Sequence, residues 1–565
     1  MFRLNRLSYY IIFCIIILSL TSCDNSSKEG ASEDHNPEHW EVDYIRKVIY
    51  QHQGLEKYTS PVQITFVREM NSHIEELLEE LPNETLEDNR WTQLYEEVLG
   101  IEIKYDWIES GHLYHQKYSV ALTSGNLPDV VRVNSQQLRE LSNAGLIQDL
   151  TTVYEEFATP WTKAVMSQEG DGPFETATLD GKLMGIPEVD SSIEKAQFIW
   201  IRTDWLDQLG LDPPETMEDV LSISKAFTEK DPNQSGEDDT YGLAITQHLW
   251  DPVMGVAGFM AGFDAFPTIW IENDDGELVF GGIQPEVKTA LGALQEMYQD
   301  GQLDVEFGFK DGNKVIEQIA NGEIGMLYGE QWSSFRVGVS RVDDPSAEWK
   351  AFPIVSNSNE LAKIPLKYGS HTFLAVRKGY ENPEAIIKLI NLHLEKNWGG
   401  TEDYKNYYST PHPVWQLSPV TPFPALKNLD AYRLLKVAHQ SGSDSGLNPE
   451  ARSIKFNIDQ YVKNNNESGW GWEKTYGPTG AFSILEQYVQ NDQLLYDQFV
   501  GPPSITMVEM KPIMDNLMHD TYVNIILGTP LYEFDQFVDN WNRMGGEKIT
   551  EEVNQWYCEW VKDEN

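Results

Sequence analysis

The stretch GKLMGIPEVDSSIEKAQFIWIRTDWLDQLG, residues 181–210, decides the fold of this 565-residue chain. Before it, from Pro61 onward, β-branched strand patterns alternate with helical patterns. Within it a new strand pattern begins at Gln197–Arg202, and a new helical series follows. Alternating strands and helices predict an α/β fold, and a chain of this length exceeds what one hydrophobic core holds. The stretch therefore predicts a passage between two α/β lobes near Pro187.

The strand and helix patterns extend this prediction on both sides. In the first series they predict strands at 62–67, 101–107 and 129–133 with helices at 114–122 and 136–143, an order typical of a mostly parallel sheet covered on both faces. In the second they predict helices at 217–227 and 383–394, strands at 241–246, 324–328 and 371–377, and a hairpin at 273–276. The last 120 residues have mainly helical patterns. We expect an N-terminal lobe from 59–188 plus about 366–445, and a C-terminal lobe from about 189–365 plus 446–565.

The N-terminus has the pattern of an export signal. Arg3 and Arg6 precede an apolar stretch at 7–20, which is too short to span a membrane, and small residues follow before Cys23. Leu20-Thr21-Ser22-Cys23 resembles a bacterial lipobox, which implies a signal peptide at 1–22 and acylation of Cys23. The alternative is an ordinary signal peptide with Cys23 near the cut by chance. We expect a lipid-anchored protein on the outer face of the plasma membrane, with a flexible tether at 23–58.

The composition argues against a nucleic-acid partner. The chain has a formal charge of −47, and without the two basic residues of segment 1–22 it has 40 basic against 89 acidic residues, a charge of −49. Such a field repels phosphate backbones and anionic lipid head groups. Of the three cysteines, Cys14 leaves with the signal and Cys23 is lipidated, so Cys558 has no partner for a disulfide.

Several segments together resemble the extracellular solute-binding proteins of carbohydrate ABC importers, above all their large Gram-positive lipoprotein subgroup. The matching segments are Ser124–Val130, Gly181–Pro187, Trp200–Gly210, Asn321–Met326 followed by Trp332, Gly501–Met507 and Phe534–Trp541. The resemblance implies an α/β fold with two lobes, a hinge, an interlobe cleft and a mainly helical C-terminal part. It also implies capture of a carbohydrate, expected to be an oligosaccharide, and delivery to permease subunits driven by a cytoplasmic ATPase. We expect a monomer without enzymatic activity.

Two other functions stay open at this point. A sugar-sensing lipoprotein would bind the same ligand and signal to a membrane kinase. A surface glycosidase or lyase is the third candidate, because Glu188 and Asp190 are two nearby carboxylates of the kind that glycosidases need. Such pairs arise by chance among 89 acidic residues, and no H-E-x-x-H, G-x-S-x-G or Walker-type motif occurs.

Aromatic and polar residues near strand ends are the candidates for sugar binding. Aromatic planes cover the flat C–H faces of sugar rings at low entropic cost. The stacking candidates are Trp332, Tyr328, Trp250, Trp270, Trp470 and Trp472, the last two in a Gly-rich segment expected to be a loop. The polar candidates are Asn134, Glu188, Asp190 and Lys367, and a uronic-acid ligand would need a cation such as Arg132 or Lys367. The alternatives are core packing for each tryptophan and an ordinary surface or hinge position for each polar residue.

The segment DPNQSGEDD at 231–239 has oxygen-bearing side chains at alternate positions and a glycine for the turn. This resembles the first half of a calcium loop. By resemblance to related sugar-binding proteins, the ligands are Asp231, Asn233, Ser235, the carbonyl of Glu237, and Asp239. Gly242 stands where an EF-hand has glutamate, and Thr240 replaces another frequent glutamate. We expect structural Ca²⁺ and no other cofactor, the alternative being a solvated acidic turn.

Overall fold

A computed structural model describes residues 52–409 and 411–563. The predicted signal peptide, Cys23 and the first part of the predicted tether lie outside these residues. Within them, no helix is both long enough and apolar enough to cross a membrane. Cys558 is an exposed free thiol.

Two hydrophobic cores account for the buried apolar side chains. The first core draws on residues between 55 and 189 and between 373 and 425, and the second on residues between 193 and 366 and between 429 and 553. The chain therefore passes between the cores near residue 190, near residue 370 and at 425–429. The last passage comes earlier in the chain than the change of lobe predicted at about 445.

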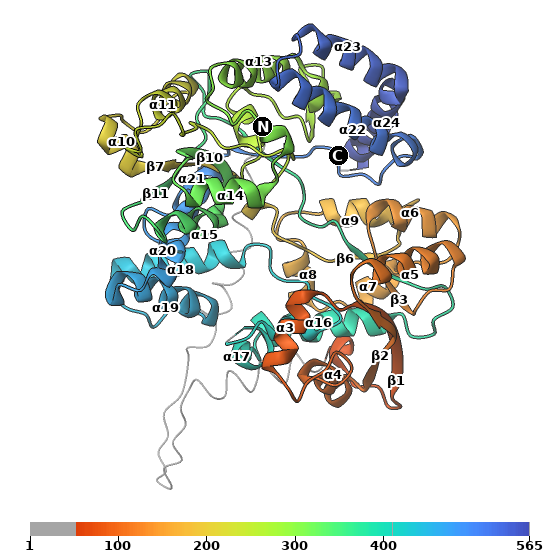
Figure 1. Cartoon of the computed structure of the whole chain (residues 1–565). Helices are drawn as coiled ribbons and strands as arrows, with labels where there is room; N and C mark the ends of the chain where they lie inside the picture. Colours follow the sequence, from red (N-terminus) through yellow and green to blue (C-terminus); the bar gives the residue numbers. More distant parts are fainter. Residues whose placement is uncertain (1–51, 410, 564–565) are drawn as a thin grey trace, which may run out of the picture. The chain divides into compact units, whose positions relative to one another are not determined.

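The elements around the first core come from two separate parts of the chain (Figure 1). They are β1 (Val62–Glu69), α3 (Ser72–Glu80), α4 (Arg90–Leu99), β2 (Ile101–Glu109), α5 (Gly111–Ser124), β3 (Val130–Val133), α6 (Ser135–Asn143), α7 (Thr151–Phe157), α8 (Pro160–Met166), α9 (Gly172–Ala177), β4 (Thr178–Leu179), β5 (Lys182–Leu183), β6 (Ile186–Pro187), β13 (Phe373–Val376), α16 (Glu384–Trp398) and α17 (Tyr404–Tyr407). The predicted strands and helices of the first series are confirmed, with ends moved by a few residues.

The elements around the second core include the whole C-terminal helical part. They are β7 (Gln197–Arg202), α10 (Thr203–Leu209), α11 (Met217–Glu229), α12 (Ala257–Ala261), β8 (Trp270–Glu272), β9 (Leu278–Phe280), α13 (Pro285–Gln299), α14 (Gly312–Ala320), β10 (Met326–Glu330), α15 (Ser334–Val337), β11 (Trp349–Phe352), β12 (Ile364–Leu366), α18 (Lys427–Ser441), α19 (Pro449–Asn464), α20 (Trp470–Tyr476), α21 (Ala481–Gln490), β14 (Leu494–Tyr496), α22 (Ile505–Ile526), α23 (Tyr532–Trp541) and α24 (Glu547–Asp563).

The predicted mostly parallel sheet is wrong. β1 pairs with β2 in parallel, but β13 lies between β3 and β6 and is antiparallel to both. In the second lobe, β7 lies between β10 and β11, again antiparallel. The reason is the passage between the cores. β13 and β7 each follow a passage from the other lobe, and the strands beside them run toward that other lobe, so each pair is antiparallel.

Two further local predictions need correction. The predicted strand at 241–246 forms only isolated bridges, from Tyr241 to Ile324 and from Ala244 to Leu327. The Gly-rich segment expected to be a loop contains helix α20, because its glycines lie against Phe335 and at the helix ends rather than in extended turns. The predicted hairpin is confirmed: β8 and β9 pair around a turn in which Gly276 has a φ of 77°.

Candidate functional site

The carboxyl ends of β1 and β3 border a pocket of about 190 Å³, which we call the arginine pocket. Its lining residues are Phe66, Val67, Arg68, Glu69, Asn71, Ile74, Tyr105, Tyr114, Tyr118, Val130, Arg132, Leu374 and Pro419. A bulge at the Phe66/Val67 step of the β1–β2 pairing lies beside it, as bulges often do at functional sites. In α/β proteins, ligands bind beyond the carboxyl ends of strands. The pocket therefore lies where the fold expects a ligand.

Arg132 in this pocket is held by the predicted site residue Glu188. Its Nε lies 2.6 Å from Glu188 Oε2, and its Nη2 donates to Oε1 over 2.8 Å. The Nε–Oε2 approach lacks hydrogen-bond geometry, so one hydrogen bond and an ionic contact hold the two side chains together. The backbone N–H of Glu188 also donates to the Thr372 carbonyl, so the pair is anchored to both passages between the cores.

The two passages near residues 190 and 370 are in close contact. The Gly369 N–H donates to Ser192 Oγ over 2.7 Å. A Cβ at Gly369 would come within 2.8 Å of the Asp190 backbone, so this approach requires glycine. The Glu169 carboxylate accepts the N–H groups of Ser192 and Ile193, each at 2.8 Å. These contacts define the backbone path of the hinge region.

Trp332 follows the end of β10 and contacts a carboxylate there. Its indole N–H donates to Glu330 Oε2 over 2.7 Å, and the Arg336 guanidinium lies 5.5 Å from the ring centroid. Burial raises the pKa of Glu330 to about 7, while the hydrogen bond from Trp332 and the charge of Lys195 act to lower it. Trp332 is half-buried, so part of its ring stays accessible.

Charged residues of the first passage lie close enough to act on Glu330. The negative charges of Glu194 and Asp190 also raise its pKa. Lys195 Nζ lies 3.4 Å from Asp190 Oδ2. Together, Asp190, Glu194, Lys195, Glu330 and Trp332 form what we call the passage cluster. The structure thus brings the predicted residues Asp190 and Trp332 near one another.

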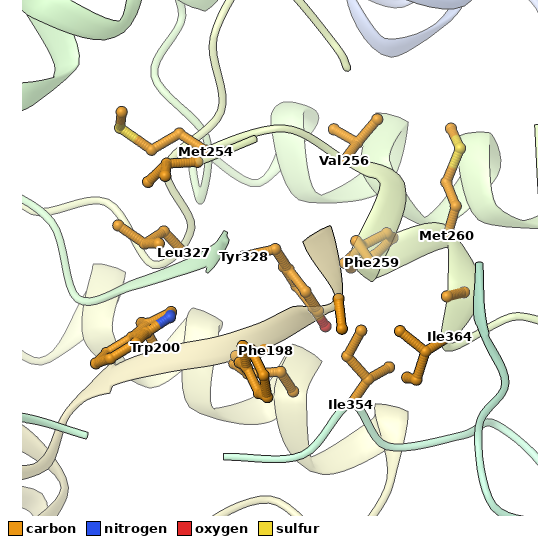
Figure 2. Packing of buried hydrophobic residues seen from close by; sticks show 14 of the residues in the cluster. Phe198, Trp200, Met254, Val256, Phe259, Met260, Leu327, Tyr328, Ile354 and Ile364 are labelled. Carbon is orange, nitrogen blue, oxygen red and sulfur yellow. The ribbon is translucent and has the colours of Figure 1, made fainter. Parts of the chain in front are cut away.

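Tyr328, Trp270 and Trp470 are core residues in this structure. Figure 2 shows the Tyr328 ring among Phe198, Phe259 and Ile354, and the side chain has no exposed surface. Trp270 is 5% exposed and packs on Phe280 and Phe499. Trp470 is 2% exposed and lies beneath Arg341 and Lys474. We leave these three out of the proposed site.

The other predicted residues interact with groups outside the passage cluster. Trp250 is half-buried with its ring against Tyr522, and Trp472 packs on Phe335 and Tyr476. Asn134 caps α6 by accepting the Gln137 N–H. Lys367 is exposed, and its charged neighbours are Lys511, Asp497 and Asp515.

The 231–239 segment folds back on itself as a compact loop. Asp231 accepts the N–H groups of Ser235 and Gly236 at 3.0 and 3.1 Å. Asp239 Oδ1 accepts from Ser235 Oγ at 2.9 Å and from Asn233 Nδ2 at 3.0 Å. Gly236 has a φ of 78°, the left-handed conformation that the tight turn of a calcium loop needs.

The donor set of this loop fits a hard cation, with one departure from the EF-hand. The segment offers carboxylate, amide, hydroxyl and carbonyl oxygens, and Ca²⁺ prefers oxygen ligands. A Cβ at Gly242 would come within 2.2 Å of Ser224, so no glutamate fits at that position. The Thr240 hydroxyl is buried and donates to the Phe227 carbonyl. Among the described residues, no group of three or more His, Cys, Asp or Glu side chains is placed to hold a metal.

Several site residues were missed by reasoning from the sequence. Arg68, Tyr105, Tyr114 and Tyr118 line the arginine pocket, and Glu330 contacts Trp332. The strand pattern could have identified Arg68. Alternate residues of a strand point to the same side, and Arg68 falls on the side of the buried residues Ile64 and Phe66. An arginine in such a register indicates a polar cavity at the strand end.

Comparison with protein families gives a match over more than half of the chain. The family model described as bacterial extracellular solute-binding protein matches residues 74–396. Lipoprotein LipO of Bacillus subtilis (strain 168) is 25% identical over 264 residues, which are 45% of this chain and 49% of LipO. The polygalacturonan/rhamnogalacturonan-binding protein YtcQ of the same organism is 21% identical over 485 residues, 81% of this chain and 86% of YtcQ. The match to LipO thus spans about half of that relative's length.

Solved structures share the fold of the chain. The Streptococcus pneumoniae ABC-transporter substrate-binding protein FusA in complex with kestose aligns with a TM-score of 0.57 and 15% identity, covering 89% of this chain and 100% of FusA. The alginate-binding protein AlgQ2 without calcium ion aligns with a TM-score of 0.60 and 14% identity, covering 89% and 99%. At this identity the likeness concerns the fold alone, which is the predicted two-lobed α/β fold.

Proposed function

Because the chain belongs to the bacterial extracellular solute-binding protein family, we propose that it captures a carbohydrate outside the cytoplasm and delivers it to an ABC importer. The names of its relatives support this ligand class: YtcQ is a polygalacturonan/rhamnogalacturonan-binding protein, and FusA is the substrate-binding protein of a fructooligosaccharide ABC transporter. The observation that carries the proposal is the position of Trp332, a partly accessible indole, beside the charged residues of the passage between two cores. An oligosaccharide is the expected ligand.

The proposed mechanism is closure of the lobes around the sugar. A ligand that contacts residues of both lobes binds the closed state more tightly and so shifts the population toward it. Trp332 would stack on a sugar ring, while Glu330, Asp190 and Lys195 supply acceptors and a donor for hydroxyl groups. Glu188 would act through Arg132, whose position it holds. Trp250 and Trp472 are candidates for additional subsites.

The proposed partners follow from import. The closed form would dock on permease subunits that a cytoplasmic ATPase drives. Acylated Cys23 would hold the protein on the outer face of the plasma membrane, and the tether would raise its concentration at the importer. A monomer suffices for this role, and no catalytic residue is needed, since members of this family are binding proteins. The runner-up function is sugar sensing for a membrane kinase, which would use the same ligand site.

We also propose that the 231–239 loop binds Ca²⁺. Asp231, Asn233, Ser235, the Glu237 carbonyl and Asp239 would be the ligands, and their hydrogen bonds already hold the loop in a compact form. A bound cation would compensate the charges of Asp231 and Asp239 and stabilise the end of α11. Its role would be structural, because Thr240 and the Phe227 carbonyl tie the loop to the second core.

Calorimetric titration with neutral and uronic-acid oligosaccharides tests the binding proposal. We expect measurable binding to at least one of them without production of new reducing ends. New reducing ends from pure protein would instead indicate a glycosidase or a lyase. Absence of binding to the whole series would contradict carbohydrate capture. Neighbouring genes separate the two binding functions, because permease genes support import and a kinase gene without permeases supports sensing.

A further inference from the structure

Arg68 is a cation without an acidic partner in the arginine pocket. One of its Nη2 hydrogens is donated to the Gln416 carbonyl over 2.7 Å. Within residues 52–409 and 411–563, no carboxylate lies within 4.0 Å of its guanidinium, whereas Arg132 in the same pocket forms an ion pair with Glu188 through one hydrogen bond from Nη2. Burial lowers the pKa of Arg68 and the positive charge of Arg132 lowers it further, while Tyr105 and Glu188 act to raise it. A guanidinium nevertheless stays charged in proteins, so a positive charge borders the pocket without a carboxylate in direct contact.

A second donor in the pocket, the buried Tyr105 hydroxyl, has no hydrogen-bond partner at all among the described residues. Buried hydroxyls without a partner are rare because they lose the hydrogen bonds that water gives them. Tyr118 is engaged differently, since its hydroxyl donates to the Arg132 carbonyl and its ring stacks on Tyr114. Besides the Arg132 Nε, which also lacks a hydrogen bond, Arg68 and Tyr105 are thus the groups that a ligand in the pocket would satisfy.

The other polar groups that line the arginine pocket leave an excess of hydrogen-bond donors. Glu69 is the one carboxylate among the lining residues, and its Oε1 lies 3.9 Å from His115 Nε2 on α5, beyond hydrogen-bond distance. Helix α3 begins at the pocket, where Asn71 caps it by accepting the Ile74 N–H. The N-terminus of a helix carries partial positive charge and favours an anion nearby. The wall therefore offers more hydrogen-bond donors than acceptors, in a chain whose overall charge is strongly negative.

We propose that the arginine pocket is an anionic subsite, in which Arg68 and Tyr105 bind the carboxylate of an acidic sugar. The proposal rests on carbohydrate capture as the function and adds that the preferred ligand carries a uronic-acid unit. A carboxylate matches the planar guanidinium with two parallel hydrogen bonds, and Tyr105 supplies a third donor. Ligand pockets usually measure about 300–1,000 Å³, so the smaller volume suits one end of an oligosaccharide rather than the whole molecule.

A series of matched ligands tests this subsite. We would titrate the protein with three 1,4-linked trisaccharides that share their linkages and differ only at C6: a carboxylate, its methyl ester and a hydroxymethyl group. A fourth ligand, with sulfate on the hydroxymethyl oxygen, separates recognition of a carboxylate from recognition of any anion. We expect the carboxylate to bind at least about tenfold more tightly than its ester, in line with a charge-assisted two-point pair.

Three variants assign the preference to residues. R68Q should reduce the ratio between carboxylate and ester to near one, while affinity for the neutral trisaccharide stays within about twofold. R68K should retain part of the ratio, because ammonium keeps the charge but not the planar pair of donors. Y105F should lower it less than R68Q. R452Q is the control: Arg452 is an exposed arginine on α19, so the variant makes the same charge change away from the pocket.

The outcomes separate this proposal from carbohydrate capture. Equal binding of carboxylate and ester, or an unchanged ratio in folded R68Q, would overturn the anionic subsite and leave sugar binding intact. If the sulfated trisaccharide binds as tightly as the carboxylate, the pocket recognises any anion, and the proposed planar pairing of Arg68 with a carboxylate is wrong. If none of the trisaccharides binds, carbohydrate capture itself is contradicted. Circular dichroism and the thermal midpoint of each variant establish that it folds. If R68Q is unstable, Y105F still tests the subsite, because it loses only one oxygen.

Discussion

The arginine pocket and the passage cluster both lie at strand ends, yet their chemistry is opposite. The first holds an unpaired guanidinium and three tyrosines, and the second holds three carboxylates, one lysine and an indole. In the first, burial acts on a group that cannot lose its charge. In the second, burial raises the pKa of Glu330 to about 7, so this group can become neutral. The comparison teaches that a cation and a titratable carboxylate respond differently to the same loss of water.

Arg132 has a carboxylate partner and Arg68 has none, and removal of that partner should have the largest effect of the changes considered. Glu188→Ala leaves a second unpaired guanidinium in the pocket. Loss of one partner of a buried pair costs about 3–5 kcal/mol, and because the Arg132 side chain is 38% exposed we expect about 2 kcal/mol, measured by urea unfolding. Asp190→Ala is the control, since its contact with Lys195 is longer and more exposed. An equal loss in both variants would contradict the role of the pair.

Truncation of the indole tests the passage cluster. Trp332→Ala should weaken binding of the preferred sugar by about 30-fold, which corresponds to about 2 kcal/mol for a central aromatic contact. Trp161→Ala, which removes an exposed tryptophan of α8, should leave affinity unchanged. Calorimetry measures both. Full affinity in the Trp332 variant would remove this residue from the site.

The two regions also differ in how stability depends on pH. The pKa of Glu330 is raised from 4.5 to about 7 by burial, so the folded state holds the neutral acid more readily than the unfolded state does. Its contribution to stability is present below about pH 4.5 and is lost as pH rises to about 7. Glu330→Gln should therefore gain thermal stability relative to the wild type between pH 5 and pH 8. Glu551→Gln, an exposed site on α24, should show no such trend.

Removal of calcium should have the smallest effect. If the 231–239 loop binds the ion, chelation should lower the melting temperature by a few degrees, as expected for loss of a ligand that binds only the folded state. Asp239→Asn should abolish the response to added Ca²⁺, while Asp274→Asn in the β8–β9 turn should not. A melting temperature that is the same with and without a chelator would argue against a stabilising ion.

Much of the fold could be predicted from the sequence because its signals are local. Alternation predicted β1 and β2, and helical periodicity predicted α11 and α16 to within a few residues. Strand direction could not be predicted in this way. Nothing within 373–376 says that β13 inserts between β3 and β6, because its neighbours lie more than 180 residues away in the chain.

The candidate site was predicted less completely for the same reason. Trp332 and Tyr328 lie four residues apart and were both predicted to stack on a sugar, but Tyr328 is fully buried against Phe259 while Trp332 lies at the strand end. Glu188 was chosen as a contact for hydroxyl groups, whereas in the structure it holds Arg132. Arg68 was overlooked because its significance depends on the lack of a carboxylate beside it, which only the packed structure shows.

The sequence by itself determined the series of strands and helices and the passage near Pro187, since each depends on neighbouring residues. The tertiary structure alone decided which aromatic rings are buried, which arginine is paired and where the strand ends meet. These properties depend on segments that are distant in the chain, such as Gln416 against Arg68 and Glu188 against Arg132. Burial and charge compensation are properties of packed surroundings, and a local pattern does not contain them.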